Sequence, residues 1–162
     1  MQFKKSFFIL IIAIFLNGCA STEYTSQKSV FIVFKTPTFK VADLGFVYES
    51  TEKIKIEMYS NGQAIMALSL GQENICMSIF QCMDKKSFNQ NMLNAAYPED
   101  ILSHIFRAEP IFKGENIRKT RNGFTQYLSK TAQYDINYSV LNKHVIFHDT
   151  INNIIIKIKR LK

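Results

Sequence analysis

This 162-residue sequence lacks the motifs by which most enzymes are identified. It contains no G-x-S-x-G nucleophile motif and no glycine-rich phosphate loop. Its carboxylates Asp43, Glu49, Glu57 and Asp149 form no recognisable acid–base pair. We therefore expect a protein that is not an enzyme and that has no catalytic residues.

Histidine is scarce as well, and its spacing argues against a metal site. His144 and His148 fall on one face of an expected strand, about 13 Å apart along an extended chain, which is too far to share a metal ion. His104 stands alone in a helical pattern. The sequence thus predicts neither a metal ion nor a dissociable cofactor.

A long apolar run is missing too. The unbroken apolar stretch from Phe7 to Leu16 is shorter than the roughly 20 residues that a membrane-spanning helix needs. Lys4 and Lys5 precede it, and Gly18-Cys19 follows it. This arrangement predicts a cleaved signal peptide over residues 1–18, with an uncleaved membrane anchor as the alternative.

The segment Leu16-Asn17-Gly18-Cys19 resembles the lipobox of bacterial lipoproteins. The resemblance implies that the Cys19 thiol carries a diacylglycerol and that Cys19 becomes the mature N-terminus. Two or three acyl chains attach a protein stably to a membrane. Ala20 follows the cysteine where an aspartate often signals inner-membrane retention. We therefore expect attachment to the outer membrane of the bacterial envelope, facing the periplasm, and no nucleic-acid partner.

Only two further cysteines remain, Cys76 and Cys82, and export would place them in an oxidising compartment. On one straight strand their Cα atoms would lie about 20 Å apart, so a bond requires a turn between them. We favour a structural disulfide over two free thiols, and the spacing is not that of a CxxC redox motif.

The formal net charge is +7, and Lys4 and Lys5 would leave with the signal peptide. The remaining basic excess gathers at Lys157, Lys159, Arg160 and Lys162 and at Lys113, Arg118, Lys119 and Arg121. Such clusters are typical of solvated strand faces and a basic tail. The alternative is a patch that binds anionic lipid or an acidic partner.

Residues 19–29 are small and polar and predict a flexible tether, and residues 30–162 predict a single domain. Most of this domain alternates in period two, as in Ile54 to Met58, and Asn61-Gly62 predicts a hairpin turn. Residues 75–80 predict one strand. About nine or ten strands follow from the whole pattern.

The middle of the chain changes to a helical period, which predicts a helical insertion over about 87–107. Ser87 is the expected N-cap of its first helix. Ile101, Leu102, Ile105 and Phe106 form one apolar stripe before Pro110. We predict a mainly β fold with a small α part, a curved antiparallel sheet forming a half-barrel covered by the central helix.

The order of these elements between Phe39 and Phe112 is similar to that of the lipoprotein-receptor family LolB and its carrier relative LolA. The similar segments include Phe46-Val47-Tyr48, Lys53 to Tyr59, Ala64 to Leu70 and Ile101 to Pro110. The resemblance implies a half-barrel with a helical lid and an apolar cavity that accepts lipoproteins from a periplasmic carrier. The family's protruding apolar loop is replaced here by the tight, polar Ser60 to Gln63.

The function expected from these observations is binding or transfer of acyl chains or lipoproteins at the outer membrane. The predicted cavity is lined by Phe34, Ile54, Ile56, Met58, Met66, Leu68, Leu102 and Phe106. The 14 phenylalanines and seven tyrosines also fit a filled core. That alternative corresponds to an assembly accessory lipoprotein of an outer-membrane complex, and a surface adhesin is a weaker third hypothesis.

Overall fold

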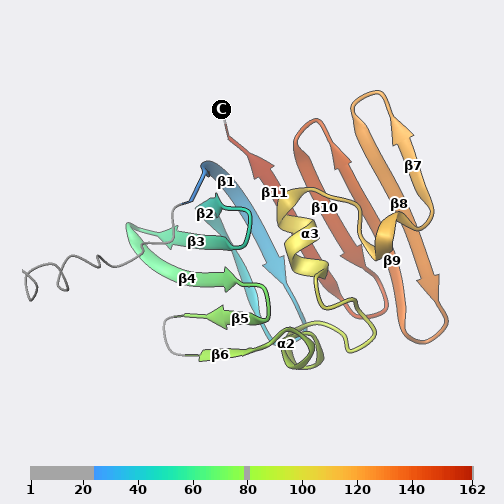
Figure 1. The fold of residues 1–162 in the computed structure, drawn as a ribbon, viewed down its shortest axis with the longest axis horizontal. Coiled ribbons are helices and arrows are strands. Elements are labelled where there is room, and N and C mark those ends of the chain that lie inside the picture. The colour runs from blue at the N-terminus through green and yellow to red at the C-terminus, as the bar shows by residue number, and fades with distance from the viewer. Residues whose placement is uncertain (1–23, 79–80, 162) are drawn as a thin grey trace, which may run out of the picture.

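A computed structural model describes residues 24–78 and 81–161 (Figure 1). Cys19 and the expected signal peptide lie outside these residues. The strands are β1 Ser26–Lys35, β2 Lys40–Glu49, β3 Ile54–Ser60, β4 Gln63–Leu70, β5 Asn74–Met77, β6 Gln81–Asp84, β7 Ile117–Thr120, β8 Gly123–Lys130, β9 Tyr134–Leu141, β10 His144–Asp149 and β11 Ile154–Arg160. The helices are α2 Lys85–Met92, α3 Ile101–Arg107 and the short 3-10 helix η1 Phe112–Gly114.

All eleven strands form one open antiparallel sheet in the order β6-β5-β4-β3-β2-β1-β11-β10-β9-β8-β7. We call β1–β6 the first wing and β7–β11 the second wing, and the pairing of β1 with β11 joins them. In Figure 1 the second wing runs steeply across the view while β3 to β6 run almost horizontally, so the sheet is strongly curved. The expected mainly β half-barrel with a helix is confirmed.

Local turn chemistry accounts for the hairpins between successive strands. Asn61 and Gly62 both adopt positive φ, 50° and 79°, in the β3–β4 turn, which confirms the expected hairpin. Along β3 the buried Ile54, Ile56 and Met58 alternate with half-exposed residues. This alternation gives the sheet an apolar inner face and a more polar outer face.

Gly45 in β2 shows how closely the strands approach one another in the first wing. A Cβ at this position would lie 2.2 Å from the backbone oxygen of Glu57 in β3. Because a real Cβ does not approach an oxygen so closely, only glycine allows this contact. Strand β2 as a whole extends over Lys40–Glu49.

Two boundaries differ from the sequence-based expectation. The flexible tether expected over residues 19–29 cannot extend beyond Thr25. Ser26 already belongs to β1 and pairs with Glu49 of β2. Lys28 adds an ion pair of 2.5 Å to Glu49. This pairing extends the domain four residues before the expected start, because the polar side chains do not prevent the backbone from joining the ladder.

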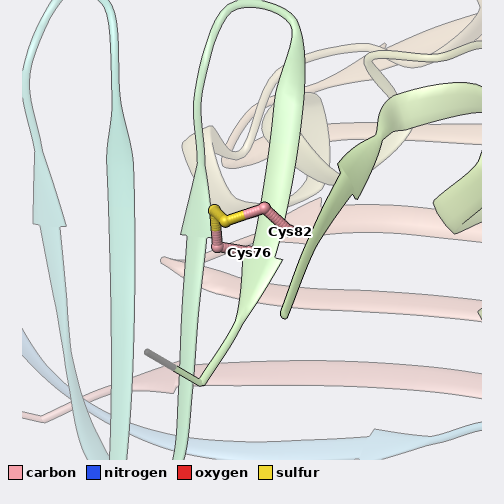
Figure 2. Close-up of a disulfide and its surroundings, with 2 residues drawn as sticks. All are labelled: Cys76 and Cys82. Carbon is pink, nitrogen blue, oxygen red and sulfur yellow. A yellow bond between two sulfur atoms is a disulfide. The ribbon is translucent and has the colours of Figure 1, made fainter. Parts of the chain in front are cut away.

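The single strand expected over residues 75–80 is shorter, since β5 ends at Met77 and is one arm of a hairpin. Its arms are β5 and β6, and Cys76 lies directly opposite Cys82. Their Cα atoms are 3.9 Å apart and a disulfide joins them (Figure 2). Ser78, with φ of 60°, begins the reversal that periodicity alone did not reveal.

The helical insertion occupies the expected region, with a different cap. Asp84, rather than Ser87, is the N-cap of α2, and its Oδ1 accepts a 2.8 Å hydrogen bond from the Ser87 backbone N–H. Helix α3 ends at Arg107, and Ala108 follows in the left-handed conformation with φ of 63°. Pro110 then prevents any continuation of the helix.

Candidate functional site

The candidate site is the apolar inner face of the sheet beneath α3. Ile101, Leu102, Ile105 and Phe106 of α3 are all buried and belong to the same core cluster as the inward residues of the strands. In Figure 1 this helix crosses in front of the sheet near the junction of the two wings. The apolar stripe of the sequence is thus the surface with which α3 covers the sheet.

The eight predicted cavity residues are brought together in this cluster. In β3 and β4, Ile56 lies opposite Leu68 and Met58 lies opposite Met66. Phe34 of β1 packs edge-on against Phe39, with ring centroids 5.9 Å apart. All eight side chains, those of Phe34, Ile54, Ile56, Met58, Met66, Leu68, Leu102 and Phe106, are between 0 and 5 % exposed.

These residues form a filled core in this conformation. Three shallow hollows of about 410, 420 and 360 Å³ are lined by other residues and open at the surface. The first lies on the outer face of β7–β10, beside Tyr127 and His148. The eight residues lie in one buried cluster together with the apolar face of α3, and the lining of a ligand cavity by them stays a prediction.

Asp149, at the end of β10, fixes the segment before α3 to the second wing. The Tyr97 hydroxyl donates to the Asp149 carboxylate, which also accepts from the backbone N–H groups of Asp135, Ile151 and Asn152 at 3.0–3.2 Å. Burial, reinforced by the hydrogen bond to Asp149, raises the pKa of Tyr97 well above its ordinary value. The phenol therefore stays protonated and remains the donor.

Gln126 and Tyr138 attach the segment after α3 to the same wing. Gln126 accepts from the Ile111 backbone N–H at 2.9 Å and donates to the Ile111 carbonyl at 3.0 Å. The Tyr138 hydroxyl donates to the Glu109 carbonyl at 2.9 Å. Burial raises the pKa of Tyr138, so this phenol also keeps its proton. We call residues 97–111, which contain α3, the cover. Both of its ends are thus bonded to buried polar side chains of the second wing.

Toward the first wing, the contacts of α3 are of another kind. Its buried face meets apolar side chains of the core cluster. Arg107 donates through Nη2 to the Ser50 carbonyl at 2.8 Å, in the β2–β3 connection at the rim. Lys85 of α2 forms an ion pair with Asp100, which joins the two helices to each other.

The three histidines lie on two different elements, two of them on strand β10 and one on helix α3. His144 lies opposite Lys159 and His148 opposite Ile155, both on the outer face of β10. His104 lies on α3, 3.4 Å from Glu109. Within residues 24–78 and 81–161 there is no group of three or more histidine, cysteine, aspartate or glutamate side chains placed to hold a metal ion.

The polar attachment residues Tyr97, Gln126 and Asp149 were not identified from the sequence as members of the site. A signal did exist for Gln126, since it occupies an inward position of β8 between Phe124 and Leu128. A polar residue on an apolar face needs a buried partner. The identity of that partner, the backbone of Ile111, depends on tertiary structure.

The chain matches no protein-family model and no curated protein. No helix within its described residues is long and apolar enough to cross a membrane. The candidate site therefore has to be interpreted from its own geometry.

Proposed function

We propose that this protein is a lipid-anchored lipoprotein of the bacterial outer membrane that binds acyl chains between α3 and the first wing. The observation that supports this most directly is the unequal attachment of the cover. Both ends of the cover are hydrogen-bonded to the second wing, whereas Arg107 forms its hydrogen bond to the first wing at the rim and the buried face of α3 belongs to the apolar core cluster.

An acyl chain is chemically suited to replace such contacts. Leu102 and Phe106 fill the inner face with hydrocarbon, and an acyl chain in their place would bury a comparable apolar area. The hydrogen bonds of Gln126 and Tyr138 need not break if α3 pivots about the second wing. Lipoproteins, or a periplasmic carrier that delivers them, are the partners that this chemistry favours.

Binding is tested with a photoactivatable diazirine fatty acid added to the full-length protein. The proposal expects cross-links on Met58 or Met66 of the first wing or on Phe106 of α3, all three in the buried core cluster. Cross-links confined to the outer face, or their absence at saturating probe, would overturn it. Competition by unlabelled palmitate serves as the specificity control.

The anchor is tested separately through Cys19→Ala. The unmodified protein should stay with envelope membranes through a high-salt wash, since its acyl chains hold it by apolar burial. Cys19→Ala should be released by that wash. Retention of the variant would contradict the anchor without bearing on acyl binding.

A second function is favoured by the filled core itself. An assembly accessory lipoprotein needs a closed domain that presents a surface to an envelope complex, and the buried inner face provides such a domain. Purification from detergent-extracted envelopes discriminates between the two. Recovery with lipoproteins or a soluble carrier supports acyl transfer, and recovery with an outer-membrane complex supports the accessory function.

A further inference from the structure

The outer face of the four central strands, β2, β1, β11 and β10, has an unusual composition. Its outward positions carry Lys35, Lys40, Lys157 and Lys159 together with two histidines. These strands contain three carboxylates, Asp43, Glu49 and Asp149. Each lies opposite an inward residue of the neighbouring strand and so belongs to the inner face of the sheet. This surface, which we call the basic outer face, therefore contains four lysines and no carboxylate of its own, and the outward carboxylates Glu57 and Asp135 belong to the flanking strands β3 and β9.

Apolar side chains lie between these cations in the same rows. Lys159 is opposite Phe31, and Phe31 is opposite Leu44. In the next row, Lys157 is opposite both Val33 and Ile146. Leu44 is 52 % exposed, Ile146 41 % and Phe31 38 %. Large apolar groups exposed beside lysines are typical of surfaces that lie at a lipid interface.

The position of this face relative to the expected anchor supports the same partner. The chain between Cys19 and Ser26 can span at most about 25 Å when fully extended. Ser26 begins β1, and Phe31 follows on the same strand about 17 Å further along. A bilayer that holds Cys19 is therefore within reach of the basic outer face.

We propose that the basic outer face docks on an anionic phospholipid bilayer and so orients the anchored domain. This rests on the proposed anchor at Cys19, although the face is defined by the strands alone. Lysine contributes about 1 kcal/mol near an anionic surface, which corresponds to about fivefold in the docking equilibrium per residue. With the outer face against the bilayer, α2 and α3 on the other side of the sheet point away from it.

The complete absence of tryptophan provides a clean probe. Leu44→Trp introduces a single tryptophan at an exposed position of the face, and Gln90→Trp introduces one on α2, on the helix side of the sheet. The full-length lipidated variants are reconstituted into phosphatidylglycerol or phosphatidylcholine vesicles that contain brominated lipid. The proposal expects bromine quenching of Leu44→Trp in phosphatidylglycerol only, loss of quenching in 1 M salt, and no quenching of Gln90→Trp.

Charge reversal at two lysines makes the test quantitative. Lys157→Glu with Lys159→Glu should lower the docking equilibrium constant of Leu44→Trp by about 25-fold or more. Lys86→Glu with Lys119→Glu changes the same charge at exposed positions of α2 and β7, and should leave quenching unchanged. An equal loss in both pairs would mean that only net charge matters, and it would overturn docking by this face.

Flotation of the vesicles separates the two proposals. If the protein floats and Leu44→Trp is unquenched, the docking proposal is overturned and the anchor stands. If the protein does not float, the proposed anchor is wrong. Docking is then tested by adding the protein to phosphatidylglycerol vesicles, where quenching of Leu44→Trp that is lost in high salt supports docking and its absence overturns it. If Leu44→Trp responds only to acidic envelope proteins, the face binds protein and the bilayer proposal is overturned.

Discussion

The two wings of the sheet hold the same covering segment by different physical means. The second wing contributes buried hydrogen bonds from Gln126, Tyr138 and Asp149. The first wing contributes the bond of its Ser50 carbonyl with Arg107 at the rim, and it shares with the second wing the apolar core cluster to which α3 belongs. Hydrogen bonds are lost abruptly with distance and direction, whereas apolar contacts can be replaced by any hydrocarbon of suitable shape. The difference makes the second wing the fixed side of the cover.

Aromatic packing strengthens this contrast. Tyr97 contacts Phe147 edge-on at 5.8 Å, and Phe112 contacts Tyr134 at 5.2 Å. Asp149, which accepts from Tyr97, is 0 % exposed, so water does not compete for its hydrogen bonds. A ligand that enters from the first wing would therefore leave this cluster intact.

The largest effect is expected from Asp149→Ala, which removes the fixed side. Several donors, among them the Tyr97 hydroxyl and the Ile151 N–H, would lose a buried acceptor. We expect a loss of about 3–5 kcal/mol in the free energy of unfolding, measured with urea. Asp43→Ala in the first wing, where the carboxylate accepts from Leu44, is the control and should lose less than about 1 kcal/mol. Equal losses would remove the contrast between the wings.

Leu102→Ala tests the apolar side of the comparison. Leu102 is buried, so we expect a loss of about 3 kcal/mol in the free energy of unfolding. Leu128→Ala, a buried leucine in β8 of the second wing, is the matched control with a similar loss. Binding of the diazirine fatty acid should rise only in Leu102→Ala, because only that substitution opens space under α3. Parallel changes in both variants would contradict a site at the first wing.

Much of this architecture follows from local patterns. Alternation located most strands, and Asn61-Gly62 specified its hairpin because both residues tolerate positive φ. Likewise, the apolar stripe of α3 identified its buried face. The hairpin of β5 and β6 was missed because each arm has only four residues, too few to show a period.

The features that the sequence did not predict depend on contacts between residues that are brought together by the fold. Asp84 and Ser87 are both good capping residues, and only the backbone conformation decides between them. Asp149 was evident as a carboxylate, and its bonds from the Ile151 and Asn152 backbone are local to the turn after β10. Its other donors, the Asp135 backbone and the Tyr97 hydroxyl, reach it only in the folded protein. Whether the eight apolar residues enclose a space or fill it depends on side-chain packing, which periodicity does not encode.

The disulfide permits a smaller test at the outer edge of the first wing. Replacing both Cys76 and Cys82 by serine should cost about 2 kcal/mol in the chain-entropy description, because the closed loop is short. Native-state hydrogen exchange should accelerate in β5 and β6 and at the start of α2. The second-wing strands should keep their protection, and faster exchange in β8–β10 would show that the wings are coupled more tightly than their contacts suggest.

Alkaline pH tests the two buried phenols, Tyr97 and Tyr138, that attach the cover to the second wing. The pKa values of Tyr97 and Tyr138 are raised above the unfolded value of about 10, so their stabilisation is complete below that pH. Above it the unfolded chain loses protons that the native state keeps, and stability falls by up to about 1.4 kcal/mol per pH unit for each tyrosine. Urea unfolding between pH 9 and 12 measures the slope. Tyr97→Phe with Tyr138→Phe should make the slope less steep without abolishing it, because the pKa values of Tyr48, Tyr59, Tyr127 and Tyr134 are raised as well. An unchanged slope would refute the assignment.

The smallest change in stability is expected from Arg107→Ala, which most specifically probes the side of the cover that is proposed to open, between α3 and the first wing. Its hydrogen bond to the Ser50 carbonyl lies at the rim, so we expect a loss of only about 1 kcal/mol or less in the free energy of unfolding. Exchange of the α3 amides should nevertheless increase, because this bond holds α3 to the first wing. Lys86→Ala, an exposed residue of α2, is the control and should leave α3 exchange unchanged. If Arg107→Ala instead loosened the hydrogen bonds of Gln126, the cover would open on the side of the second wing, and the proposed direction of opening would be reversed.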